Sequence, residues 1–227
     1  MNTPQSNAVI LLSGGLDSAT VLAIARQEGW VCHALVIDYN QRHRHEIDAA
    51  RRVAEQIGTA SLTIMPLDLR LFGASALTAD IAVPKHAEQA GIPATYVPAR
   101  NTVFLAIAGA MAESLAAQAI FIGVNAIDYS GYPDCRPEFI EQFERTLTLG
   151  TKQGVEGSPI RIIAPLASLT KAQIIARGTA MGVDYALTHS CYDPSSSGLA
   201  CRVCDSCVLR SRGFEQAGIP DPTRYSP

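Results

Sequence analysis

Short apolar segments of strand length alternate along the chain with longer segments that have helical spacing. The apolar segments are expected to form β-strands and lie at residues 8–12, 31–37, 61–65, 119–124 and 160–163. Helices are expected at residues 18–27, 46–57, 102–118, 137–149 and 170–181. In the second of these, apolar residues stand at positions 47, 50, 53, 54 and 57, which places them on one face of a helix.

Strands that alternate with helices indicate βαβ units and a parallel sheet. We therefore predict an α/β fold in which helices cover both faces of a parallel five-stranded sheet. Residues 67–99 break the alternation with three prolines and two glycines, and are expected to form a long loop over the mouth of the site. The last 40 residues also break it. Ligands of such sheets bind at the carboxyl ends of the strands.

Composition and charge narrow the classes of partner. The 227 residues include 18 Lys and Arg and 21 Asp and Glu, which gives a net charge of −3. This balance argues against a dominant nucleic-acid-binding surface, which usually shows as a basic patch, and leaves open a local basic groove. The sequence holds no apolar run long enough to span a membrane. The polar start at residues 1–7 lacks the pattern of a signal peptide, so a cytoplasmic location is expected.

A glycine loop, Ser13-Gly14-Gly15-Leu16-Asp17-Ser18, follows the first strand. Two glycines allow a phosphate to approach the backbone closely, and the next helix offers free N–H groups. The loop lacks the lysine of the common phosphate loop, and Asp17 could instead hold Mg²⁺ that bridges phosphates. An ordinary strand-to-helix turn, capped by Asp17, is the alternative.

Polar residues also follow the next strands. Arg42, His43, Arg44 and His45 come after the second strand and suit a phosphate or carboxylate, although a solvated helix start explains them equally well. Arg100 stands beside a predicted helix start and suits an anionic ligand. Its neighbour Asn101 is expected to cap that helix.

The loop after the fourth strand, residues 123–137, is rich in side chains that bind a polar aromatic ring. Asp128 or Asp134 could accept hydrogen bonds from the N–H edge of a guanine-like base, and Tyr129 or Tyr132 could stack on it. A structural loop rich in tyrosine and proline is the alternative interpretation.

Thr170 is expected to cap the last predicted helix and Lys171 to lie in its first turn. A lysine there opposes the helix dipole, so its position suggests a phosphate partner. The alternative is a solvated surface lysine.

Four cysteines near the end of the chain, Cys191, Cys201, Cys204 and Cys207, have the spacing of metal ligands. Four thiolates can complete a tetrahedral zinc site of the structural kind. An iron–sulfur cluster is the second possibility, because Cys-x2-Cys-x2-Cys also begins a ferredoxin-type run. Cys32 is expected in the core, and Cys135 in the polar loop is either a reactive thiol or a packing residue.

The glycine loop resembles the signature of the PP-loop ATP pyrophosphatases, which form adenylates and let a nucleophile displace AMP. The full set of motifs resembles one family among them, the 7-cyano-7-deazaguanine synthases of queuosine biosynthesis. The matching segments span residues 12–207 and are LSGGLDS, DYNQRHRHE, YVPARN, GVNAIDYSGYPDCRPEF, HSCY and CRVCDSC. Asn40 stands where the family is expected to have glycine, which leaves the local turn uncertain.

The resemblance implies an ATP-dependent carbon–nitrogen ligase that converts 7-carboxy-7-deazaguanine and ammonia into the nitrile. ATP activates the carboxylate, ammonia gives an amide, and a second activation lets the amide lose water. It implies a Rossmann-like PP-loop domain at residues 1–187 and a small zinc-binding segment at 188–227. It also implies Mg²⁺ with ATP, one structural Zn²⁺ per chain and a homodimer, with no nucleic-acid or membrane partner.

The resemblance also assigns roles to residues. Ser13, Asp17 and Lys171 are the expected catalytic residues. The expected ATP-binding residues are Leu12, Ser13, Gly14, Gly15, Leu16, Asp17, Ser18 and Arg100. The expected substrate-binding residues are Asn125, Asp128, Tyr132 and Asp134. The four clustered cysteines are the expected zinc ligands.

Two rival functions stay open. Another PP-loop enzyme that thiolates or amidates RNA would need an RNA-binding domain or a basic surface, and neither is visible in the sequence. A non-enzymatic nucleotide-binding zinc module would bind ATP without turnover.

Overall fold

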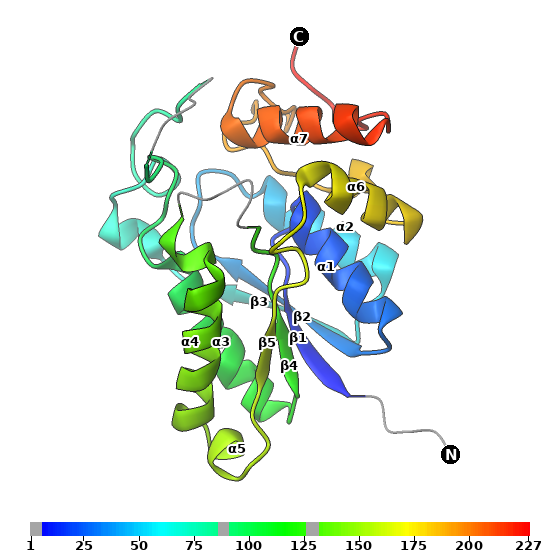
Figure 1. Cartoon of the computed structure of the whole chain (residues 1–227). Helices are drawn as coiled ribbons and strands as arrows, with labels where there is room; N and C mark the ends of the chain where they lie inside the picture. Colours follow the sequence, from blue (N-terminus) through cyan, green and yellow to red (C-terminus); the bar gives the residue numbers. More distant parts are fainter. Residues whose placement is uncertain (1–5, 86–90, 126–131) are drawn as a thin grey trace.

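A five-stranded parallel sheet forms the centre of the molecule. The structure is a computed structural model that describes residues 6–85, 91–125 and 132–227. The strands lie in the order β3-β2-β1-β4-β5 (Figure 1). Their bounds are Asn7–Leu11 (β1), Val31–Asp38 (β2), Ser61–Pro66 (β3), Ala119–Phe121 (β4) and Arg161–Ile163 (β5). Every predicted strand is confirmed, and so is the predicted fold class.

Both faces of the sheet are buried, and each belongs to a different core. Successive residues of a strand point to opposite faces. In β1, Ala8 and Ile10 therefore pack into one core, whereas Val9 and Leu11 pack into the other. Burial on both faces explains why the central strands are continuously apolar rather than alternating.

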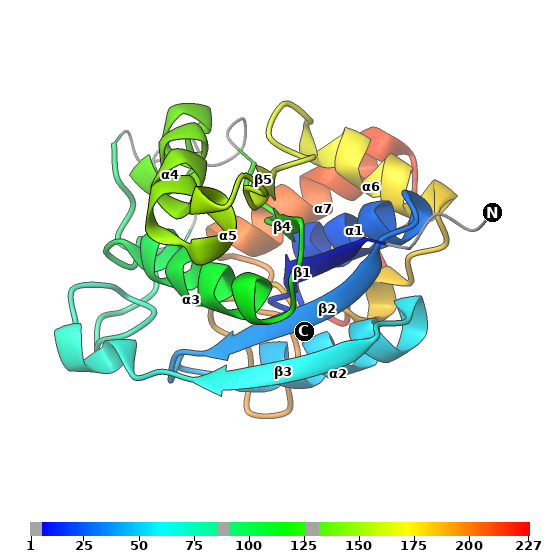
Figure 2. The same cartoon turned by 90° about the horizontal axis from the view of Figure 1, so that it is seen from below.

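Helices cover the two faces (Figures 1 and 2). The first core includes residues of α1 (Leu16–Gln27), α2 (His45–Ile57) and α6 (Lys171–Ala180). The second core includes residues of α3 (Arg100–Ser114) and α4 (Pro137–Gly150). These five helices confirm the five predicted from spacing, with shifted ends. Pro137 begins α4, and the Thr170 side chain caps α6.

Two helices were not predicted, α5 (Lys152–Val155) and α7 (Asp205–Ala217). The apolar pattern of α7 is weak, because its buried residues include Ser206 and Arg210 in addition to Cys207 and Phe214. The helix packs on α6 at Gly213, where a Cβ atom would lie 2.4 Å from Cγ of Lys171. This close approach holds the last segment of the chain against the sheet domain (Figure 1).

Residues 67–85 and 91–99 contain a single 3-10 helix, η1 (Leu69–Phe72), as expected of a long loop. The short 3-10 helices η2 (Pro133–Cys135) and η3 (Tyr185–Leu187) lie elsewhere in the chain. Among the described residues, no helix is both long and apolar enough to cross a membrane.

Candidate active site

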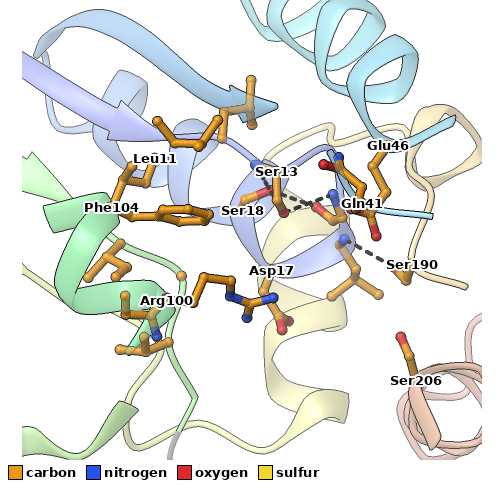
Figure 3. A pocket seen from close by; sticks show the side chains of 18 of the residues that line it. Leu11, Ser13, Asp17, Ser18, Gln41, Glu46, Arg100, Phe104, Ser190 and Ser206 are labelled. Carbon is orange, nitrogen blue, oxygen red and sulfur yellow. Dashed lines mark hydrogen bonds between the residues drawn. The ribbon is translucent and has the colours of Figure 1, made fainter. Parts of the chain in front are cut away.

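A cavity of about 220 Å³ opens at the carboxyl ends of β1, β2 and β4. Its floor includes Leu12 after β1, Ile37 at the end of β2 and Ile122 after β4. This is the edge at which ligands bind in parallel sheets. Most of the expected nucleotide-binding residues line it, namely Leu12, Ser13, Gly15, Leu16, Asp17, Ser18 and Arg100 (Figure 3). Gly14 does not line the cavity.

Gly14 supports the loop from behind. Its φ of +85° lies in the left-handed region, and a Cβ atom there would lie only 2.2 Å from the carbonyl oxygen of Glu46. Only glycine therefore lets the first turn of α2 pack directly on the loop. In the described part of the chain, no side chain caps α1 at Gly15, so the start of this helix can bind an anion. Ser13 and Ser18 lie beside it, with their hydroxyl oxygens 3.0 Å apart.

All three expected catalytic residues line the cavity, and two of them, Asp17 and Lys171, are in direct contact. Lys171 Nζ donates to both carboxylate oxygens of Asp17, at 2.8 Å each. The Lys171 side chain is 8% exposed and the Asp17 side chain 22%. The lysine therefore points into the cavity from the first turn of α6, which excludes the alternative of a solvated surface lysine.

Arg100 lines the same cavity, and in Figure 3 its side chain extends toward Asp17. Its guanidinium carbon lies 5.9 Å from the ring centroid of Tyr39 and 6.0 Å from that of Phe104. Burial disfavours the positive charge of Arg100. The electrostatic effect of Tyr39, Tyr132 and Asp134 is larger than that of burial and holds the Arg100 pKa above its ordinary value. The preceding residue, Ala99, has a φ of 53°, which is strained for alanine.

Of the four expected substrate-binding residues, two line the cavity, one does not, and one lies outside the described residues. Asn125 and Tyr132 line the cavity, and Tyr132 Oη lies 2.8 Å from Thr95 Oγ1. Asp134 does not line it, because its carboxylate accepts from the backbone N–H of Asn101 at 2.9 Å. The expectation that Asn101 caps α3 is wrong, since the N-cap is Ala99 and Asp134 binds the helix start. Asp128, like Tyr129, lies outside the described residues.

Cys135 follows Asp134 and lines the cavity. Burial, together with the Asp134 charge, raises the pKa of its thiol to about 11. Asn101 Nδ2 donates to its sulfur at 3.3 Å. These features favour the packing interpretation over the reactive-thiol interpretation, because the thiolate is the nucleophilic form.

The arginines of the loop after β2 do not reach the cavity, although their charge suits an anionic ligand. Arg42 donates to the carbonyl of Ile81, and Arg44 pairs with Asp38 at the surface. Neither arginine lines the cavity. Asn40 has a φ of 59°, a left-handed conformation that asparagine tolerates better than other non-glycine residues. The departure from glycine therefore leaves the turn intact.

The segment after α6 supplies cavity residues that the sequence pattern did not indicate, His189, Ser190, Ser206 and Arg210. His189 N donates to the carbonyl of Gly14 at 2.9 Å, and Leu16 N donates to Ser190 Oγ at 3.5 Å (Figure 3). Arg210 is 4% exposed and donates to Thr188 Oγ1 at 2.8 Å. His189, Ser190 and Ser206 belong to the matching segments HSCY and CRVCDSC, but there the cysteines indicate a structural metal site and no role in the cavity.

Glu46 is another cavity residue without a predicted role, although it belongs to one of the matching segments. It lies in the first turn of α2 and lines the cavity, as do Tyr39 and Gln41 (Figure 3). Burial raises the pKa of its carboxyl to about 7, against the opposing effect of Arg100. Burial likewise raises the pKa of Tyr39 to about 12.

The four clustered cysteines converge as predicted. The sulfur atoms of Cys191, Cys201, Cys204 and Cys207 all lie within 4.8 Å of one another. None is in a disulfide. Backbone N–H groups of Cys201 and Asp193 donate to the Cys191 sulfur, at 3.2 and 3.4 Å. Four converging thiol groups with N–H donors fit a tetrahedral metal site.

Comparison with known proteins gives consistent matches along nearly the whole chain. Residues 7–218 match the family model described as "Queuosine biosynthesis protein QueC". The 7-cyano-7-deazaguanine synthase of Methylococcus capsulatus is 63% identical over 96% of this chain and 98% of its own. That of Desulfatibacillum aliphaticivorans is 58% identical over 100% of both chains.

Solved structures with low sequence identity share the fold. An NMN synthetase from Francisella tularensis has a TM-score of 0.52 at 20% identity, covering 97% of this chain and 80% of its own. A predicted tRNA methyltransferase subunit from Methanocaldococcus jannaschii has a TM-score of 0.51 at 15% identity, covering 98% and 92%. The relatives, the family model and the converging motifs agree, and the chain belongs to the 7-cyano-7-deazaguanine synthase family of queuosine biosynthesis.

Proposed function

We propose that the cavity binds ATP and 7-carboxy-7-deazaguanine together and activates the carboxylate as an acyl adenylate, which ammonia converts into the amide. A second activation, of the amide oxygen, then allows loss of water to the nitrile. The observation that supports this most is the Asp17–Lys171 pair beside the glycine loop, in the same cavity as Arg100 and Tyr132. One cavity thus holds side chains suited to phosphates together with side chains suited to a ring.

Activation is needed because a carboxylate oxygen is a poor leaving group. Ser13, Ser18 and the N–H groups at the start of α1 are suited to the phosphates of ATP. Lys171 would balance the negative charge that develops on departing pyrophosphate, an effect that is strong in a partly desolvated site. Asp17 orients Lys171 in the free protein and would hold Mg²⁺ when MgATP binds.

The opposite wall suits the second substrate. Tyr132 and Phe104 offer ring faces, and Asn125 offers an amide that can both donate and accept. Arg100 has the charge to bind the substrate carboxylate before it reacts. In our proposal Asp134 acts indirectly, because its carboxylate holds the start of α3, where Arg100 stands. Asp128 remains a predicted contact for the ring N–H edge.

We further propose that the four cysteines hold one structural Zn²⁺. The ion would fix the segment that carries Ser190, Ser206 and Arg210 against the glycine loop. A closed shell of four thiolates leaves no position for substrate, so the metal has no part in the reaction steps. A homodimer in the cytoplasm also remains our prediction, and sedimentation equilibrium tests the dimer.

ATP–pyrophosphate exchange tests the proposed activation. Exchange should require 7-carboxy-7-deazaguanine and Mg²⁺ and should proceed without ammonia, because adenylate formation precedes attack. Exchange that needs no carboxylate, or ATP binding with no exchange, would contradict the proposal. The second result would favour a non-enzymatic nucleotide-binding module, and exchange stimulated by RNA would favour an RNA-modifying enzyme.

A further inference from the structure

Glu46 is a carboxylate in the candidate active site that has no direct partner among the described residues. In the described part of the chain it forms no hydrogen bond or ion pair, although it lines the cavity. A half-buried carboxylate without a partner is partly desolvated, which is unfavourable, and an acid beside a phosphate site repels the ligand. The placement therefore calls for a cationic or proton-donating ligand.

The backbone of Glu46 packs against the glycine loop. Its carbonyl oxygen lies against Gly14, since a Cβ atom at Gly14 would approach it within 2.2 Å. The first turn of α2 therefore packs directly against the glycine loop. In Figure 3, Glu46 and Gln41 lie on one side of Ser13, and Arg100 and Phe104 lie on the other. The carboxylate thus lies on the Gln41 side of the glycine loop, in the same cavity as Arg100 and close enough for the two charges to interact.

The surroundings of Glu46 hold the pKa of its carboxyl near neutral pH. Tyr39 and Arg100 interact with it electrostatically, and Asp17, Lys171 and His189 line the same cavity from α1, α6 and the following segment. Burial raises the Glu46 pKa to about 7. A group with this pKa can accept a proton and release it again at neutral pH.

We propose that Glu46 binds ammonium and removes its proton, so that ammonia is generated beside the acyl adenylate. The proposal rests on the function proposed above and names the residue that activates the nucleophile. Glu46 takes one proton from ammonium, and the nitrogen lone pair forms the C–N bond. The C–O bond to AMP breaks, AMP leaves with the electron pair, and water takes the second nitrogen proton. Protonated Glu46 then returns its own proton to water.

Glu46→Gln distinguishes a role as base from a role in binding substrate or Mg²⁺, because it keeps the size of the side chain and removes the basic group. Adenylate formation does not involve ammonia, so ATP–pyrophosphate exchange should stay within about twofold of the unaltered enzyme. Amide formation from ammonium should fall by roughly 100-fold or more, the usual effect of losing a general base. Hydroxylamine is largely unprotonated at neutral pH, so hydroxamate formation should be nearly unchanged.

Asp48→Asn is the matched control, because Asp48 is an exposed acid in the same first turn of α2. It loses the same charge and should leave all three reactions unchanged. An unchanged ammonium reaction in Glu46→Gln would overturn the proposal. So would a parallel loss of exchange and hydroxamate formation, which would instead assign Glu46 to substrate or Mg²⁺. An unaltered enzyme without exchange or amide formation would overturn the proposed function as well.

The pH dependence of the unaltered enzyme gives a measurement that is independent of any variant. If Glu46 deprotonates bound ammonium, kcat/KM for total ammonium should reach a plateau above about pH 7, where the carboxylate is ionised. A continued rise up to ~pH 9 would mean that free ammonia enters from solution, and this would overturn the proposal.

Discussion

Lys171 Nζ lies 2.8 Å from each carboxylate oxygen of Asp17, a contact between residues 154 positions apart in the sequence. The pair joins the first turn of α1 to the first turn of α6, at the mouth of the proposed phosphate site. A charge-assisted, bidentate contact of this kind holds both side chains in fixed positions. The free protein thus keeps its cation in position before a phosphate arrives.

Asp17→Asn should abolish ATP-dependent turnover while the chain still folds. Asparagine is a poor ligand for Mg²⁺, and it leaves the largely buried Lys171 charge without its counter-ion. We expect a loss of roughly 2 kcal/mol in the free energy of unfolding, less than for a fully buried pair. Turnover assays and urea denaturation measure the two effects. Unchanged turnover would remove Asp17 from the proposed mechanism.

Lys171→Met should lower turnover by roughly 100- to 1000-fold, because one charge that stabilises the transition state is lost. Stability should change less than in Asp17→Asn, because Asp17 is one-fifth exposed and water can reach it. Lys152→Met is the control, since Lys152 is exposed at α5 and pairs there with Glu156 at 3.7 Å. Equal activity of the two variants would contradict the role of Lys171.

Ala99→Gly should stabilise the protein and impair catalysis at the same time. Glycine relieves the left-handed strain at φ 53°, for a net gain of roughly 0.5–1 kcal/mol after its greater unfolded-state entropy. It also loosens the approach to Arg100, so kcat/KM for the carboxylate should fall severalfold. Ala116→Gly, with φ 46° just after α3, is the control that should gain stability alone. Identical kinetics in both variants would show that the strain does not position Arg100.

Glu46→Gln should stabilise the protein above neutral pH. The Glu46 pKa is raised from 4.5 to about 7, so its favourable contribution is complete below 4.5 and is lost as pH rises through 7. At pH 8 the variant should therefore be more stable, on the order of 3 kcal/mol, with little difference near pH 4.5. Denaturation across this range measures the effect. Asp48→Asn should slightly destabilise instead, since an acid in the first turn favours a helix.

Cys204→Ser should reduce both bound metal and activity. Loss of one thiolate opens the four-sulfur site, and α7, which begins next to Cys204, carries Ser206 and Arg210 into the cavity. Cys32→Ala is the control, because Cys32 packs in the first core, away from the cluster. Elemental analysis should find zinc in the unaltered protein and in this control. Iron with labile sulfide would instead support the iron–sulfur alternative.

The sequence predicts the sheet and the position of the site better than it predicts the residues of the site. Continuous apolar strands and the strand-end rule together place Ser13, Arg100 and Lys171 at one edge of the sheet, where all three line the cavity. Arg210 escapes prediction because a buried charge breaks the apolar pattern of α7. The contact of Asp134 with Asn101 joins two segments and has no local signal, so spacing alone does not distinguish a cap from a substrate ligand.

The most direct test of the central claim is mass spectrometry of the product. Folded, metal-loaded protein is incubated with ATP, Mg²⁺, ¹⁵N-ammonium and 7-carboxy-7-deazaguanine. The account predicts an early ¹⁵N-labelled amide that declines as ¹⁵N-labelled 7-cyano-7-deazaguanine accumulates, both dependent on ATP. Absence of both labelled products would contradict it.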